Sequence, residues 1–106
     1  MKTILTACCA LLVAGLPAHA SETAEIQMKT KTCVQCHGPD GNSPSPEFPR
    51  IAGQHQDYLA KALRDYKSGV RKNAIMAPMV ANLTPRDIEE IAEYYSKQKG
   101  LKTAPH

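Results

Sequence analysis

Apolar residues recur three and four positions apart in two stretches of the chain, and this spacing predicts two amphipathic helices. The first helix is expected over residues 54–68, and Gly69 follows it where a C-terminal cap belongs. Its apolar stripe comprises Tyr58, Leu59, Ala62, Leu63 and Tyr66. The opposite face is charged, as expected of a helix with one side in a core.

The second helix has the clearest end signals. Thr84 is a favoured N-cap residue, Pro85 suits the first helical position, and Asp87 stands at the capping-box position. The apolar stripe consists of Ile88, Ile91, Ala92 and Tyr95. We expect this stripe to face the core and the helix to end at Gly100.

The remainder of the chain predicts one further helix and two irregular segments. Residues 22–36 favour a helix with Ile26 and Thr30 on one face. Residues 38–46 are dense in turn-forming residues, and so long a connection in a small domain is commonly a loop around a ligand. Residues 71–83 are also expected to lack regular structure. No stretch alternates as a strand, so the predicted fold class is all-α.

The first 20 residues are typical of a bacterial export signal. Lys2 precedes an apolar stretch over residues 4–16, and the run Ala18-His19-Ala20 offers a cleavage site of the Ala-x-Ala form. The apolar stretch is too short for a membrane span, so no stable membrane insertion is expected. We therefore predict that residues 1–20 are removed and that residues 21–106 form one domain in the periplasm.

A different cleavage site is the alternative, because Leu5-Thr6-Ala7-Cys8 resembles a lipoprotein cleavage box that would leave a lipid anchor on Cys8. Most of the apolar stretch lies after Cys8, which favours cleavage after Ala20. The mature chain then keeps only Cys33 and Cys36. Its length of about 86 residues is small for a self-sufficient core, so a disulfide, metal or cofactor is expected to stabilise it.

The run Cys33-Val34-Gln35-Cys36-His37 contains the residues that indicate the chemistry. Two thiols three positions apart near a helix end can each add to a vinyl group of one haem, while the adjacent imidazole binds the iron as an axial ligand. The Cys-x-x-Cys spacing also occurs in redox disulfides and zinc sites. A thioredoxin-like disulfide expects a βαβ context, and a structural zinc site needs four ligands, for which only His55 and His106 remain. The motif therefore favours one covalently bound haem c.

An electron carrier needs a second axial ligand on its iron. Met28 lies on the same predicted helix as His37, and we expect it to be a core side chain. Met76 and Met79 lie in the irregular segment between the two clearest helices, from where a flexible thioether can reach the opposite face of a haem. His55 would instead give bis-histidine coordination and a lower potential, although a histidine at a helix start is more commonly exposed or part of the cap.

Taken in order, these motifs resemble one domain of a class I cytochrome c, and in particular one half of the two-haem bacterial cytochromes c4. The resemblance rests on residues 33–38, 40–43, 48–54, 58–59, 67–69, 73–76 and 83–84. It implies a class I cytochrome c fold, in which three main helices and long loops wrap around one covalent haem. The chain departs from the two-haem pattern because it contains a single haem motif.

The resemblance also implies roles for individual residues. Met76 rather than Met79 is implied as the distal iron ligand, opposite His37 as the proximal ligand. Pro49 matches the proline whose backbone carbonyl accepts a hydrogen bond from the proximal imidazole. Ile51 matches an apolar residue packed on the haem edge.

Two further features allow more than one interpretation. Asn73 falls where, in the resemblance, a side-chain amide could bond the methionine sulfur, and an ordinary loop asparagine explains it equally well. A run of cations could steer an acidic partner toward the haem edge, but a solvated helix face explains it as well. These cations are Arg64, Lys67, Arg71 and Lys72. The formal net charge of +3 falls to +2 with the loss of Lys2, and the dispersed lysines do not form a nucleic-acid footprint.

A histidine and a methionine at the axial positions raise the reduction potential and leave no open site for a substrate. We therefore expect an electron-transfer protein rather than an enzyme. It would shuttle between a quinol-oxidising complex and a terminal oxidase or reductase, as a monomer or weak dimer. One alternative is the haem subunit of a dehydrogenase, such as the cytochrome half of a flavocytochrome sulfide dehydrogenase. Another is a peroxidase or gas-binding haem protein, which requires an open sixth position.

Overall fold

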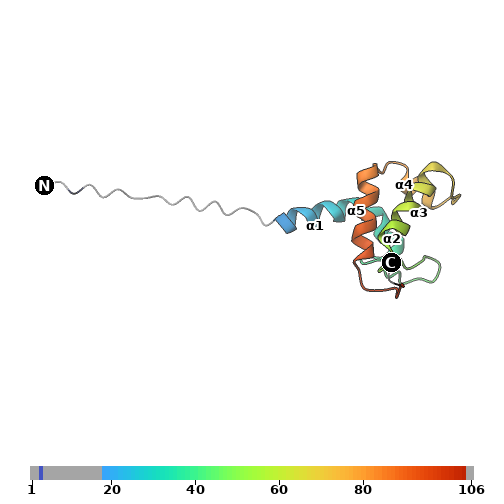
Figure 1. Cartoon of the computed structure of the whole chain (residues 1–106), viewed down its shortest axis with the longest axis horizontal. Helices are drawn as coiled ribbons and strands as arrows, with labels where there is room; N and C mark the ends of the chain where they lie inside the picture. The colour runs from blue at the N-terminus through green and yellow to red at the C-terminus, as the bar shows by residue number, and fades with distance from the viewer. Residues whose placement is uncertain (1–2, 4–17, 105–106) are drawn as a thin grey trace.

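The computed structural model describes residue 3 and residues 18–104, with the backbone alone for residues 18–22. This part of the chain contains five α-helices and no strand, so the all-α prediction is confirmed (Figure 1). The helices are α1 Ala18–Lys29, α2 Lys31–His37, α3 Gln56–Ser68, α4 Met76–Val80 and α5 Pro85–Ser96. None of these described helices combines the length and the apolar character needed to cross a bilayer. The export signal predicted for residues 1–20 lies outside the described residues, apart from residue 3 and the start of α1.

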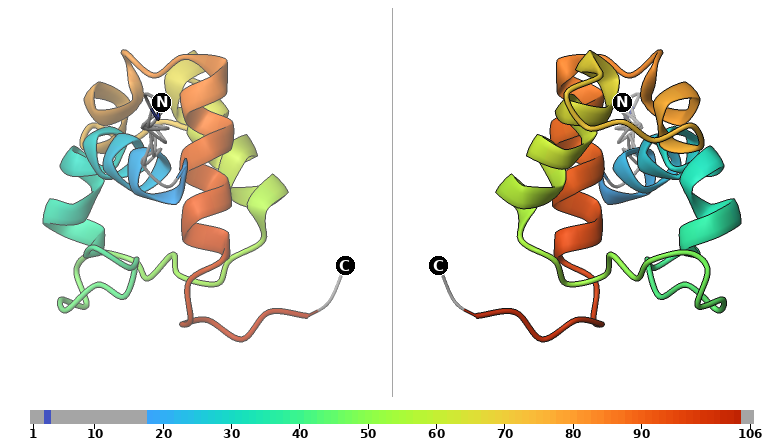
Figure 2. Two further views of the ribbon diagram at one scale, coloured as in Figure 1. Left: turned by 90° about the vertical axis from the view of Figure 1, so that its left-hand side faces the viewer. Right: turned by 90° about the vertical axis from the view of Figure 1, so that its right-hand side faces the viewer.

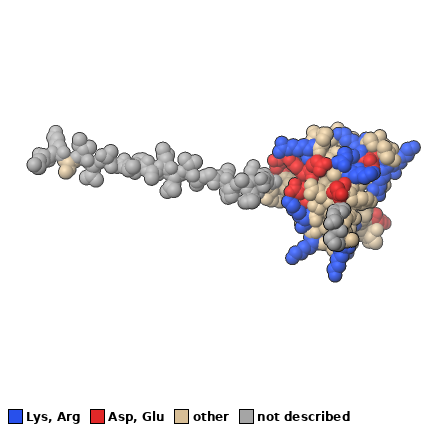
Figure 3. Space-filling model, in the orientation of Figure 1, with Lys and Arg blue, Asp and Glu red and all other residues tan. Residues whose placement is uncertain are grey.

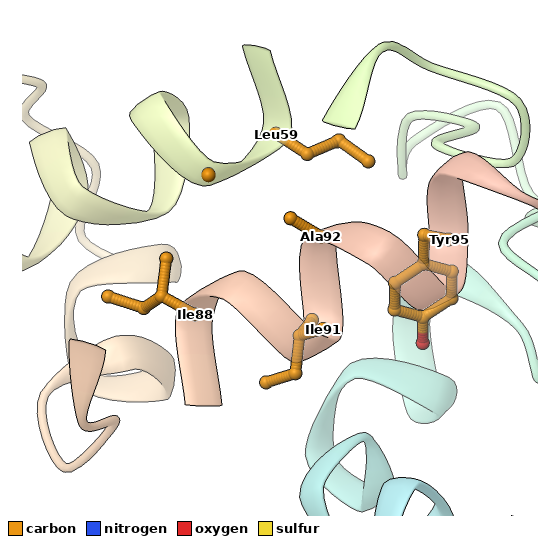
Figure 4. Close-up of a cluster of buried hydrophobic side chains, with 6 residues drawn as sticks. Leu59, Ile88, Ile91, Ala92 and Tyr95 are labelled. Carbon is orange, nitrogen blue, oxygen red and sulfur yellow. The ribbon is translucent and has the colours of Figure 1, made fainter. Parts of the chain in front are cut away.

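The core forms where α3 packs against α5. The buried side chains of this cluster are Leu59 and Ala60 of α3 and Ile88, Ile91, Ala92 and Tyr95 of α5 (Figure 4). Ile26, Cys33 and Ile51 are partly buried against it. The apolar face predicted for α5 is therefore confirmed. On α3 the prediction holds for Leu59 and for Leu63, which packs against the cluster, whereas Tyr58 is 50% exposed and lines a surface hollow at the start of the helix.

The local sequence predicts the first residue of α5 correctly, but it does not predict where the helix ends. The Thr84 hydroxyl accepts a hydrogen bond from the Asp87 N–H at 3.0 Å, and the Asp87 carboxylate accepts one from the Thr84 N–H at 3.0 Å, so the capping box is confirmed. The helix ends at Ser96, and the predicted end at Gly100 is wrong. Gly100 instead permits two chain segments to approach closely, because a Cβ there would lie 2.6 Å from the Cβ of Ala52.

The single helix predicted over residues 22–36 is interrupted at Thr30, between α1 and α2. Thr30 is buried, and its hydroxyl donates a hydrogen bond to the Ile26 carbonyl at 2.9 Å, an interaction that commonly bends helices. The core position predicted for Met28 is wrong, since this side chain is 79% exposed. Ile26, and not Met28, faces the core from α1.

The segment predicted to be irregular, residues 71–83, contains the short helix α4, so this prediction is wrong. Asn73 forms a turn just before the helix, in which its side-chain oxygen accepts hydrogen bonds from the backbone N–H groups of Ile75 and Met76, both at 2.9 Å. Pro78 is tolerated because the N–H groups in the first turn of a helix have no partner within that helix.

The helices are arranged around α5. In Figure 2, α3 lies on one side of α5 and helices α1 and α2 lie on the other. Residues 38–55 join α2 to α3 and cross below the C-terminal end of α5. In the same views α4 lies above α2, on the same side of α5 (Figure 2). The two helices that contain the predicted iron ligands thus lie on the same side of α5, and α4 itself packs against α3.

Candidate functional site

The seven-residue helix α2 contains both cysteines and the histidine of the motif. Cys33 and Cys36 are half-buried and their thiols are unpaired. Their spacing of three residues places both on one face of the helix. Gly38 follows His37 with a φ of 82°, a conformation that favours glycine, so the chain turns away directly after the motif. Burial raises the pKa of the Cys33 thiol.

The His37 ring is oriented by the backbone of the following loop. His37 is 8% exposed, and its Nδ1 lies 2.8 Å from the carbonyl oxygen of Pro49. A carbonyl can only accept a hydrogen bond, so we assign the proton to Nδ1, and Nε2 keeps the lone pair that a metal ligand needs. The contact implied for Pro49 is therefore present, and the assignment of His37 as an iron ligand stays a prediction.

Gly41 holds the loop that presents Pro49. Its carbonyl accepts hydrogen bonds from the N–H groups of Ile51 at 2.9 Å and Ala52 at 3.1 Å. Gly41 has a φ of 83°, and a Cβ there would lie 2.8 Å from both Ala52 N and the Tyr95 ring. The loop therefore packs tightly on α5, and Ile51 is partly buried against the core cluster.

The two candidate distal methionines differ in burial. Met76 is the first residue of α4 and is partly buried, whereas Met79 is 43% exposed. The hydrogen bond between Asn73 and the Met76 N–H fixes the backbone from which the Met76 side chain leaves. A bond from the Asn73 side chain to the methionine sulfur stays a prediction, and the structure shows that this side chain accepts the N–H groups of Ile75 and Met76. The difference in burial favours Met76.

His55 lies away from the motif, at the N-cap of α3. Its side chain makes no cap hydrogen bond, but its carbonyl accepts one from the Leu59 N–H at 3.0 Å. It lines an open surface hollow together with Gln54, Asp57, Tyr58 and Lys61. The hollow contains none of the residues predicted to bind iron, and the cap association expected for His55 is confirmed.

Tyr95 contributes a polar atom that the sequence did not single out. Its side chain is 1% exposed, as expected for the apolar stripe of α5. Its hydroxyl is the one buried side-chain polar atom without a hydrogen-bond partner among the described residues (Figure 4). Burial raises the pKa of the Tyr95 hydroxyl, so it stays protonated at neutral pH.

The residues of α2 and the loop fit a covalently attached haem. Cys33 and Cys36 offer two free thiols at the required spacing, and His37 offers an oriented Nε2 immediately after them. The Tyr95 hydroxyl, which has no partner in the adjoining core, is also explained if a bound group such as the haem completes the packing there. The donor set is therefore the one that a haem c requires.

Positive charge gathers on the surface around α4. Residues 66–86 contain no acidic residue and four cations, Lys67, Arg71, Lys72 and Arg86. In Figure 3, Lys and Arg side chains extend over this part of the molecule, at the upper right. Arg64, also in the predicted cationic run, is paired with Glu89 at 2.9 Å. Three apolar side chains, Val70, Ile75 and Met79, are exposed in the same region.

Comparison with known proteins gives matches over most of the chain. The sequence model of the cytochrome c family matches residues 22–99. Cytochrome c4 of Pseudomonas aeruginosa is 40% identical over 98 residues, which are 92% of this chain and 49% of that protein. Cytochrome c-554(548) of Halomonas halodenitrificans is 41% identical over 83 residues, which are 76% of this chain and 100% of that protein. The structure of reduced cytochrome c4 from Pseudomonas stutzeri matches with a TM-score of 0.68 and 44% identity, over 74% of this chain and 46% of that one. The chain thus spans about half the length of the cytochromes c4.

Proposed function

Since the chain belongs to the cytochrome c family, we propose that it is a periplasmic single-electron carrier with one covalently bound haem c. The observation that supports this most is the arrangement at the end of α2. There the buried His37 ring donates a hydrogen bond to the Pro49 carbonyl, 2.8 Å away, beside two unpaired thiols. A histidine held in this way is ready to bind iron, and the thiols are ready to attach the haem.

Cys33 and Cys36 attach the haem in this proposal. The two thiols would hold the haem through thioether bonds to its vinyl groups, a linkage that needs no external oxidant. His37 provides the proximal ligand through Nε2, and the Pro49 carbonyl fixes the ring and raises its basicity. Ile51, which is partly buried against the core, would pack against the haem edge and help to exclude water from it.

Met76 provides the distal ligand. The bound haem supplies a ferric/ferrous couple, whose potential rises when a thioether lies opposite an imidazole. If His37 and Met76 both bind the iron, they would leave no place for a substrate, and the protein would act in electron transfer and not as an enzyme. Its partners would be a quinol-oxidising complex and a terminal oxidase or reductase.

One haem and an exported domain complete the proposal. The chain contains one Cys-x-x-Cys-His motif, and it aligns with the full length of a shorter relative, cytochrome c-554(548). Residues 1–20 would be the cleaved export signal, and residues 21–106 the periplasmic domain.

A haem subunit in a dehydrogenase is the second candidate. Val70 is 78% exposed, Ile75 is 58% exposed and Met79 is 43% exposed, all close in sequence to Met76. A permanent partner would bury such apolar side chains near the haem. Co-purification of the chain with a larger protein from its source would favour this candidate over a free carrier.

The test is to produce the full chain with a haem-attachment system and to examine the purified protein. The proposal expects a mass increased by one haem, loss of residues 1–20, a reversible one-electron titration, and no carbon monoxide binding by the reduced protein at neutral pH. A matched Cys33→Ser/Cys36→Ser variant should lack the haem. A colourless wild type with the mass of its amino acids alone would refute the proposal, and carbon monoxide binding would indicate a gas-binding or peroxidase site instead.

A further inference from the structure

The Tyr95 hydroxyl is buried in the core and has no hydrogen-bond partner among the described residues. Its side chain is 1% exposed, and no described residue makes a hydrogen bond with its oxygen. A buried tyrosine normally finds an acceptor for its O–H group, because an unpaired hydroxyl in an apolar core is destabilising. Phenylalanine would fill the same space without this penalty. The hydroxyl therefore points to an acceptor outside the polypeptide.

The surroundings of Tyr95 fix the direction of its hydroxyl. In Figure 4 the ring extends from α5 and its oxygen is directed toward α1 and α2. The ring packs against Gly41, where an added Cβ would come within 2.8 Å of it, and its centroid lies 5.0 Å from that of Tyr94 in an edge-to-face contact. The ring is thus confined on two sides and cannot turn its oxygen to solvent.

Of the two cysteines of the motif, Cys33 is the one that faces the core. Its side chain packs against the core cluster that contains Tyr95. The charge of a Cys33 thiolate is, after burial, a further cause that raises the pKa of Tyr95. A thioether formed at Cys33 would offer sulfur lone pairs and no donor, which suits an O–H group without a partner.

We propose that Tyr95 donates a hydrogen bond to the thioether sulfur that joins Cys33 to the haem. This inference rests on the proposed function as far as the haem is attached at Cys33. The bond draws electron density from the sulfur and so from the porphyrin edge, which favours the ferrous state and raises the reduction potential. Tyr95 is then a positioning residue that sets the potential from the core.

The adjacent Tyr94 is a matched control. Its hydroxyl already donates to the Pro39 carbonyl at 2.7 Å and is therefore satisfied without a haem. Tyr95→Phe and Tyr94→Phe each remove one hydroxyl from the same helix. We expect Tyr95→Phe to lower both the midpoint potential and the melting temperature of the holoprotein, and Tyr94→Phe to leave the potential unchanged.

Proton NMR of the reduced wild-type holoprotein tests the bond without a variant. The Tyr95 hydroxyl proton should exchange slowly and show a nuclear Overhauser effect to the thioether protons at Cys33. An effect to a haem propionate or to a protein carbonyl group would overturn the proposal, as would rapid exchange. A Tyr95→Phe holoprotein with an unchanged potential and an equal or higher melting temperature would also overturn it. Such a result would mean that the hydroxyl has no partner in the holoprotein, since removing an unpaired buried hydroxyl does not destabilise a protein. A wild-type protein without haem would overturn the proposed function together with this inference. The NMR and Tyr95→Phe results named above, obtained with a protein that carries haem, would overturn only the role of Tyr95.

Discussion

Lys29 on α1 forms an ion pair with Glu90 on α5. The Lys29 ammonium also lies 3.2 Å from the Asp87 carboxylate and 3.0 Å from that of Glu25. With 18% of the lysine side chain exposed, one cation joins three carboxylates where α1 meets α5. The hydrogen bond from Lys29 lowers the pKa of Glu90, and the hydrogen bond from the Thr84 backbone is the main cause of a lowered pKa at Asp87.

Replacing Lys29 by methionine is expected to lower the melting temperature at pH 7 and to make the fold less sensitive to acid. A carboxylate whose pKa is lowered by folding stabilises the protein above its unfolded pKa, and this contribution disappears as the pH falls through the lowered value. For Glu90 the loss therefore begins below about pH 4.5 and continues into more acidic solution. Melting curves followed by circular dichroism at several pH values measure this effect.

Lys61→Met is the control for this change. Lys61 pairs with Asp65 one turn further along α3, and its side chain is 67% exposed. Such exposed pairs contribute little, so the pH profile of Lys61→Met should run parallel to that of the wild type. If Lys29→Met also gives a parallel profile, the acid sensitivity arises elsewhere and not from this ion pair.

The two methionines near α4 can be separated by substitution. Met76→Ala should abolish the near-infrared absorption band of sulfur-ligated ferric haem, because the partly buried Met76 is the proposed ligand. It should also lower the reduction potential, by on the order of 0.1 V. Met79→Ala, at an exposed position on the same short helix, should keep the band. Retention of the band in Met76→Ala together with its loss in Met79→Ala would reverse the assignment.

The ends of helices could be predicted from sequence where one residue determines them. Thr84 caps α5 through its own hydroxyl, and Gly69 ends α3 in the left-handed conformation with a φ of 85°. The predictions for Gly100 and Met28 are wrong, because the environments of these residues depend on segments distant in sequence. Gly100 meets Ala52, and Met28 lies on the side of α1 that no described helix covers.

In the site and the fold, too, local motifs could be predicted from the sequence, whereas contacts between distant segments could not. The class I cytochrome c fold expected from the resemblance is confirmed by the family match and the structural neighbour. The His37 contact with the Pro49 carbonyl was also anticipated by the resemblance. An apolar stripe predicts that Tyr95 is buried, but it contains no information on the neighbours of the phenol oxygen. Similarly, α4 follows a turn in which the Asn73 side chain accepts the Met76 N–H, and periodicity does not detect a helix of five residues.

The fold should depend on the haem for its stability. The largest fully buried side chains among the described residues are Tyr95 and Val80, which is a small core for one domain. The Cys33→Ser/Cys36→Ser chain, exported in the same way, should therefore melt without a cooperative transition. Wild-type holoprotein measured by the same circular dichroism melt is the reference. A cooperative transition in the haem-free variant would show that the polypeptide core is sufficient.

Gly41 and Gly69 provide a matched pair that separates backbone strain from steric contact. Both have a positive φ, 83° and 85°, so alanine at either position costs about 1–2 kcal/mol of conformational strain. A Cβ at Gly69 meets no atom within 4 Å, whereas a Cβ at Gly41 would lie 2.8 Å from the Tyr95 ring.

Gly41→Ala should therefore destabilise the holoprotein by at least about 1 kcal/mol more than Gly69→Ala, because overpacking adds to the strain. Denaturant unfolding of both variants, with haem content measured beside it, gives the comparison. Gly41→Ala should also yield less haem-loaded protein, since the same loop presents Pro49 to His37. Equal losses in the two variants would mean that the loop relaxes around the added methyl group, and that Gly41 does not need to be small for the loop to pack on α5.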